Sequence, residues 1–231
     1  MQRTKWVLQS TSNVKILLTI MSGRAWRWES PFGGADGQAQ FRCTDMELRR
    51  AVIRDTWLRN SSIDYRFIFG RTTDSLLSDE LSLDCDDRYY YLQHKVQAAM
   101  RYAYDQGYDF AIRCDDDTYI DLPRLLKTDF AVHDYSGYKM LGSPRAGYAH
   151  GGCYIVSRRA MQALFEAKPQ LTDWEDQWAG RELEKRSIYL HHMPEFKIVK
   201  FELTPADYGL IALHSCSPEM MREIYALDKS L

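Results

Sequence analysis

The sequence predicts an α/β protein in which a mixed, mostly parallel β-sheet carries helices on both faces. Short apolar segments rich in β-branched residues alternate with longer segments whose apolar residues recur at helical spacing. The later strand-like segments follow one another at shorter intervals, which indicates a partly antiparallel edge. An acidic cluster directly follows one of the buried strands, where ligands of open α/β sheets gather.

The first elements are expected at a strand, a loop and a helix. Val14–Ile20 is a short, β-branched run bounded by polar turn residues, as in a buried strand. Arg24–Gln40 is rich in Gly, Trp and Arg without any period, and we interpret it as an insertion or flexible loop. Asp45–Leu58 has Thr44 or Asp45 as its cap and an apolar side, so it predicts a helix.

A strand–helix–strand unit follows. Tyr65–Gly70 is an apolar run that ends at a glycine, as expected of a strand. Tyr91–Gln106 has apolar residues at helical spacing, and Gly107 stops this helix. Tyr108–Cys114 predicts a short strand that runs straight into the acidic cluster.

The second half of the chain repeats this alternation up to a final helix. Helices are expected where apolar residues recur at helical spacing, at Leu122–Val132, Arg159–Ala167, Trp174–Arg186 and Pro218–Leu227. Strands are expected at short apolar runs, at Lys139–Ser143, Cys153–Ser157, Ile188–His191, Ile198–Leu203 and Leu210–His214. We expect all 231 residues to form a single domain.

Charge and composition exclude several classes of function. The 30 basic and 32 acidic residues give a net charge of −2 without a basic stripe, so we expect no nucleic-acid partner. The longest early apolar run, Ile16–Ile20, is far shorter than the about 20 residues needed to cross a bilayer, so no transmembrane segment is expected. The widely spaced cysteines contain no C-x-x-C pair, which disfavours a zinc site or a disulfide scaffold.

The acidic cluster Asp115-Asp116-Asp117 is the first candidate for chemistry. Side chains alternate along an extended chain, so Asp115 and Asp117 share one side and Asp116 faces the other. Two carboxylates on one side suit Mn²⁺ or Mg²⁺. The alternative is an acidic turn that caps the helix starting at Leu122. A metal held there would leave positions for diphosphate oxygens, and an acceptor hydroxyl would need a second carboxylate downstream as its base.

Several separated segments resemble the inverting β-1,3-glycosyltransferases, the family of galactosyltransferases, N-acetylglucosaminyltransferases and Fringe enzymes. The resembling segments stand in the family's order. Arg49–Trp57 resembles its Arg-Arg-x-x-Ile-Arg-x-Thr-Trp segment, Phe67–Gly70 its Phe-Leu-Leu-Gly strand, and Asp84–Lys95 its Asp-x-Tyr-x-Asn-Leu-x-x-Lys stretch. Arg113–Ile120 resembles its Lys-x-Asp-Asp-Asp-x-Phe-Val metal motif, Gly151–Ser157 its Gly-x-Gly-Tyr-x-x-Ser segment, and Glu175–Gly180 its Glu-Asp-Val-x-x-Gly segment.

This resemblance implies a GT-A-like nucleotide-sugar-binding fold and a metal-dependent, inverting hexosyltransferase, of the β-1,3-galactosyltransferase type. The resemblance also implies a UDP-sugar donor, with Mn²⁺ or Mg²⁺, and a glycan or glycoconjugate acceptor. Metal binding is implied for Asp115, Asp117 and His214, and the base role for Asp176. Donor contacts are expected from Asp116, Arg49, Arg54, Arg113, Gly151 and Gly152, and an acceptor contact from Glu175. Relatives act in protein glycosylation in the Golgi lumen behind an N-terminal anchor; without one, a cytoplasmic enzyme is expected.

Each assignment has a simpler alternative. His214 could be a core histidine, and Asp176 could stabilise a helix N-terminus. Arg49, Arg50 and Arg54 could form an exposed basic helix face, and Gly151-Gly152 a simple turn. For the whole chain, the alternatives are an inactive lectin-like member or a metal-dependent nucleotide-sugar hydrolase. Arg113 and Gln177, which replace the family's Lys and Val, mildly favour an inactive member.

Overall fold

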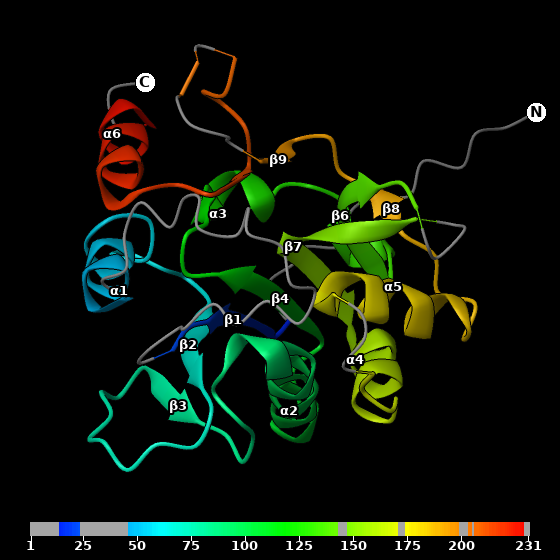
Figure 1. Cartoon of the computed structure of the whole chain (residues 1–231). Helices are drawn as coiled ribbons and strands as arrows, with labels where there is room; N and C mark the ends of the chain where they lie inside the picture. Colours follow the sequence, from blue (N-terminus) through cyan, green and yellow to red (C-terminus); the bar gives the residue numbers. More distant parts are fainter. Residues whose placement is uncertain are drawn as a thin grey trace, which may run out of the picture.

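A seven-stranded sheet forms the centre of the computed structural model, with strand order β3-β2-β1-β4-β7-β6-β8 (Figure 1). The structure describes residues 14–23, 46–142, 147–170, 174–198, 203–204 and 206–228, so the expected loop Arg24–Gln40 lies outside the described residues. The strands are β1 Ile16–Met21, β2 Asp64–Phe69, β3 Glu80–Ser82, β4 Phe110–Asp115, β6 Tyr135–Met140, β7 Tyr148–Ser157 and β8 His191–His192.

The pairing of these strands confirms a mixed, mostly parallel sheet. Strands β3, β2, β1 and β4 are parallel neighbours. Strand β7 is antiparallel to both β4 and β6, and β8 returns parallel to β6 at the edge. The parallel half therefore aligns the carboxyl ends of β1, β2 and β4 at one edge, where the acidic cluster lies.

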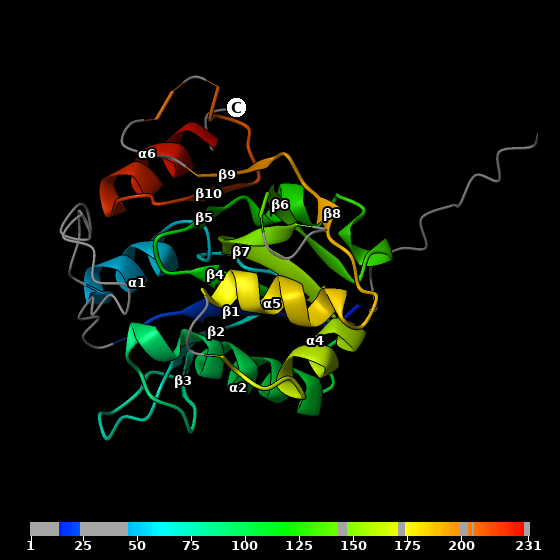
Figure 2. The same ribbon diagram turned by 45° about the vertical axis from the view of Figure 1, so that its right-hand side comes forward.

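Helices cover both faces of the sheet, as the sequence predicts (Figure 2). On β1, Ile16, Leu18 and Ile20 pack into one apolar core and Leu17 and Met21 into the other, because side chains alternate along a strand. One core contains residues of α1 (Met46–Asp55) and α6 (Pro218–Asp228). The other contains residues of α2 (Leu92–Asp105), α4 (Arg158–Phe165) and α5 (Glu175–Glu184).

A second, three-stranded sheet joins distant parts of the chain. Its strands are β5 (Tyr119–Ile120), β10 (Ala212–His214) and β9 (Phe196–Ile198), with β10 in the middle. Strand β10 runs antiparallel to β5, and Leu213 pairs with Tyr119. Because β5 follows the acidic cluster by one residue, this pairing brings the C-terminal part of the chain beside that cluster.

Some expected elements differ in the structure. The predicted helix over Leu122–Val132 is wrong. A short helix, α3 (Leu122–Leu125), begins at the Asp121 cap, and a separate 3₁₀ turn forms at Phe130–Val132. The Thr128 hydroxyl donates to the carbonyl of Leu125, which satisfies a helix-end acceptor and helps to end the helix there.

The glycine pair Gly151-Gly152 is not a turn, because it lies within β7. Strands β3 and β5 were not expected, since each has at most three residues and no detectable period. The four cysteines among the described residues are buried free thiols, Cys85, Cys114, Cys153 and Cys216. Among the described residues no helix has the length and apolar character to span a membrane.

Candidate active site

The acidic cluster lies where β4 ends and turns towards β5. Asp116 faces α1: its Oδ1 is 3.0 Å from Arg49 Nη1, and its Oδ2 accepts a 2.7 Å hydrogen bond from Ser22. Asp115 and Asp117 instead gather with His214, so the expected alternation of the three side chains is confirmed. Asp116 thus anchors the acidic cluster to Arg49 and Ser22, while Asp115 and Asp117 face His214.

The Asp117 carboxylate meets His214 of β10. Asp117 Oδ1 lies 3.1 Å from His214 Nδ1, and the Thr118 hydroxyl lies 3.2 Å from the same nitrogen. Burial disfavours both charges, but their mutual attraction prevails. It lowers the pKa of Asp117 to about 2 and raises the pKa of His214. The raised pKa of His214 thus favours its protonated form beside the two carboxylates.

The residues fit a divalent cation. One ligand atom from each of Asp115, Asp117 and His214 lies within 4.8 Å of the others. The Oδ1 atoms of both aspartates are buried, and each lies near one nitrogen, Asp117 Oδ1 near His214 Nδ1 and Asp115 Oδ1 near Arg113 Nη2. Two carboxylates and one imidazole suit Mn²⁺ and several other divalent ions, and a bound cation would displace the proton from His214.

Arg113 connects this group to helix α5. Its buried guanidinium lies 2.9 Å from Asp115 Oδ1 and 3.0 Å from Glu175 Oε2. The hydroxyl of Tyr154 donates a 2.5 Å hydrogen bond to Glu175 Oε1. Burial outweighs the attraction of Arg113 and raises the pKa of Glu175 to about 7. One guanidinium thus positions two carboxylates, one from β4 and one from α5.

Asp176 lies in the first turn of α5, next to Glu175. Its Oδ2 accepts a 3.0 Å hydrogen bond from the Gly151 backbone, and its Oδ1 accepts a 2.8 Å bond from the Gln177 backbone. Burial raises the pKa of Asp176 in spite of these two hydrogen bonds. A buried carboxylate with a raised pKa suits a general base, and the same position also stabilises the helix N-terminus.

The glycine pair of β7 touches both halves of the site. A Cβ at Gly151 would lie 3.4 Å from Asp176 Oδ2, whereas a Cβ at Gly152 would lie 2.4 Å from Cγ of His214. The backbone therefore approaches the protein's own site residues. Donor contact by these two glycines stays a prediction.

The arginines of α1 separate into two groups. Arg49 and Arg50 are buried, so the alternative of an exposed basic face is wrong for Arg49. Arg49 belongs to the Asp116 contact. Arg54 lies instead beside Asp79 at 2.8 Å and Glu80 at 2.9 Å, and no contact joins it to the acidic cluster among the described residues.

Ser22, Thr118 and Tyr154 support the site but were not among the residues predicted from the sequence. His150 of β7 lies beside His214. The two rings lie 5.0 Å apart, and burial, together with the charge of His214, lowers the pKa of His150 to about 3. Tyr154 belongs to the Gly-x-Gly-Tyr-like segment, so the motif contained a signal. Ser22 and Thr118 become significant only through contacts across the fold.

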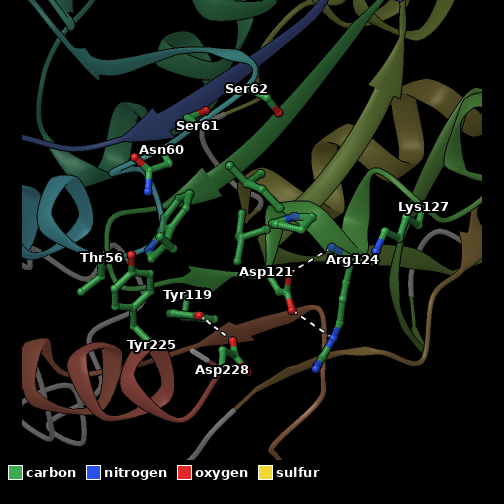
Figure 3. Close-up of a pocket in the computed structure, with 14 residues that line it drawn as sticks. Thr56, Asn60, Ser61, Ser62, Tyr119, Asp121, Arg124, Lys127, Tyr225 and Asp228 are labelled. Atoms are coloured by element: carbon green, nitrogen blue, oxygen red, sulfur yellow. Dashed lines mark hydrogen bonds and ion pairs between the residues drawn. The ribbon is translucent and has the colours of Figure 1, made fainter. Parts of the chain in front are cut away.

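A separate cavity of about 310 Å³ lies where the end of α1, α3 and α6 meet (Figure 3). Labelled lining residues include Asn60, Tyr119, Arg124 and Asp228, and Tyr119 bonds to Asp228 across it. None of the expected site residues lines this cavity. The candidate active site, at the carboxyl end of β4, is thus distinct from this cavity.

No family model matches the sequence. Among solved structures, the chain is similar to a glycosyltransferase involved in glycosylation of the major capsid of PBCV-1, with a TM-score of 0.48 and 13% identity over 91% of this chain and 99% of that chain. It is also similar to a putative nucleotide-diphospho-sugar transferase from Desulfovibrio desulfuricans G20, with a TM-score of 0.48 and 14% identity over 78% of this chain and 79% of that chain.

Proposed function

We propose that the chain is a metal-dependent glycosyltransferase that moves a sugar from a UDP-sugar to an acceptor hydroxyl. The observation that carries this proposal is the convergence of Asp115, Asp117 and His214 from β4, its following turn and β10. Asp176 lies on the other side of the Gly151-Gly152 pair, which contacts both Asp176 and His214. A cation can stabilise the departing diphosphate and a buried carboxylate can take the acceptor proton, and together they suit an inverting transfer.

The roles of the residues follow from their positions. When bound, a divalent cation supplies positive charge to stabilise the departing nucleotide diphosphate. Asp115, Asp117 and His214 would hold it, while Asp116 and Arg49 fix the turn that carries two of these ligands. Asp176 would accept the proton of the acceptor hydroxyl as that oxygen attacks the anomeric carbon. Attack from the face opposite the leaving group inverts the anomeric configuration.

Glu175 has a different role in this proposal. Arg113 and Tyr154 fix its carboxylate beside the base, where it can orient the acceptor. We extend the proposal to a β-1,3 linkage, a GT-A-like fold and a galactosyltransferase type on the resembling segments alone. The Golgi lumen is the proposed compartment if an N-terminal anchor precedes this chain, and the cytoplasm if none does.

The test is donor binding and turnover. UDP-galactose, UDP-N-acetylglucosamine, UDP-glucose and UDP-xylose are titrated by calorimetry with Mn²⁺ and with chelator, and UDP release is measured with and without acceptor sugars. We expect metal-dependent binding of one donor that Asp117→Ala abolishes. UDP release equally fast without any acceptor would favour a nucleotide-sugar hydrolase. Binding of no donor in the presence of metal would contradict the proposal.

A further inference from the structure

We propose that Asp129, His133 and His191 form a second metal site, one that prefers zinc and joins edge strand β8 to the segment after α3. The site shares no residue with the candidate active site, and it stands whether or not the chain is a transferase. One ligand atom from each of the three side chains lies within 4.8 Å of the others.

The carboxylate of Asp129 faces both imidazoles. His133 Nε2 lies 3.9 Å from Asp129 Oδ2, and His191 Nε2 lies 4.0 Å from Asp129 Oδ1. Nitrogen and oxygen ligands lie about 2.0–2.2 Å from zinc, which places tetrahedral ligands about 3.3–3.6 Å apart. The present distances therefore need only a small contraction.

The two rings must also tilt to aim at one ion. They are stacked with centroids 3.6 Å apart and an interplanar angle of 6°, so their lone pairs now run nearly parallel. Both histidine side chains are about one-third exposed, with values of 31% and 37%. They can tilt towards a common ion without disturbing the core.

The three side chains have no competing partners among the described residues, whereas neighbouring side chains of the same types do. His192 Nδ1 accepts a 3.0 Å hydrogen bond from the Lys139 backbone. Asp134 accepts from Arg159 at 2.7 Å.

The ligand set differs from that of the candidate active site, where Asp115, Asp117 and His214 form the first proposed metal centre. Two imidazoles and one carboxylate favour Zn²⁺ over Mn²⁺ or Mg²⁺, and water would complete a tetrahedron. The cysteine spacing does not bear on this site, because its ligands are histidines and an aspartate. Strand β8 has two residues and pairs only with β6 among the described strands, so the ion would add a second attachment at this edge.

The test uses the full chain with Asp117→Ala and His214→Ala, so that zinc at the first centre is not counted. Zn²⁺ is titrated by calorimetry, and stoichiometry is measured by equilibrium dialysis. We expect one equivalent of zinc. At 100 times the Kd, zinc should raise the unfolding midpoint by about 5–10 °C. Adding His133→Ala or His191→Ala should weaken zinc binding by at least about 100-fold, because even outer partners of metal ligands contribute about 10–100-fold.

Matched variants test the assignment in the same background. His192→Ala and Asp134→Asn change the same residue types nearby and should leave zinc affinity unchanged. Absence of zinc binding would overturn the proposal. So would an affinity that survives His133→Ala and His191→Ala, or one that His192→Ala reduces as strongly. The donor titration on the unmodified chain is a separate measurement, so failure of one proposal is distinguishable from failure of the other.

Discussion

Gly152 lies so close to the ring of His214 that no side chain fits between them. A Cβ at residue 152 would lie 2.4 Å from Cγ and 2.5 Å from Cβ of His214, well inside any real contact distance. At the neighbouring Gly151, a Cβ would meet Asp176 Oδ2 at 3.4 Å, an ordinary van der Waals contact. The absence of a side chain at residue 152 is therefore what lets His214 reach Asp117.

Gly152→Ala should displace His214 and weaken Mn²⁺ binding. Overpacking at a site that cannot relax costs about 1–3 kcal/mol, so we also expect a lower free energy of unfolding. Calorimetry with Mn²⁺ and urea unfolding measure the two effects. Gly151→Ala is the matched control and should change both much less. Equal effects of the two substitutions would contradict the steric explanation.

Asp176→Asn should lower turnover by about 10²–10⁴-fold, the usual contribution of a general base. Donor binding with metal should persist, because Asp176 is not among the metal-ligand group. Steady-state kinetics and donor calorimetry separate the two effects. Asp105→Asn, on the exposed end of α2, serves as the control for loss of a carboxylate. Near-normal turnover in Asp176→Asn would contradict the assignment of Asp176 as the general base.

Because of Glu175, the free energy of unfolding of the metal-free protein should fall as pH rises. The pKa of Glu175 is about 7 in the folded protein and 4.5 ordinarily, so the folded state retains a proton that the unfolded state has released. The stabilisation is complete below pH 4.5 and is lost as pH rises through about 7, a change of about 3 kcal/mol.

Urea unfolding of the unmodified chain and Glu175→Gln, with chelator at several pH values, checks this expectation. The unmodified chain should lose stability relative to the glutamine variant across that pH window. A relative gain with rising pH would mean that the attraction of Arg113 outweighs the burial of Glu175.

Tyr119→Phe should destabilise the contact between β5 and α6. The buried Tyr119 hydroxyl donates a 2.6 Å hydrogen bond to Asp228 at the end of α6 (Figure 3). A hydrogen bond to a charged group contributes about 1.5–3 kcal/mol, and here it also balances an acidic residue at a helix C-terminus. Tyr108→Phe, which removes an exposed 2.8 Å hydrogen bond to Asp64, should lower the free energy of unfolding by less. Urea unfolding of both variants measures the difference, and an equal cost would contradict the role of burial.

Local patterns were sufficient for much of the fold and part of the site. The periods of strands and helices predicted the mixed sheet, its two helical layers and most element positions. The opposite directions of Asp115 and Asp116 follow from strand geometry alone, and the structure confirms them. These properties depend on residues a few positions apart, so local patterns along the chain were enough to predict them.

Other relationships were decided by the tertiary structure. The pairing of β10 with β5 brings His214 close to Asp117. The packing of α1 near β3 places Arg54 in ion pairs with Asp79 and Glu80, away from the acidic cluster. The fit of Gly152 against His214, the bridge from Arg113 to Glu175 and the approach of His191 to His133 also join distant segments. No local period encodes such contacts, because they depend on sheet register and on how the two cores bury their apolar surfaces.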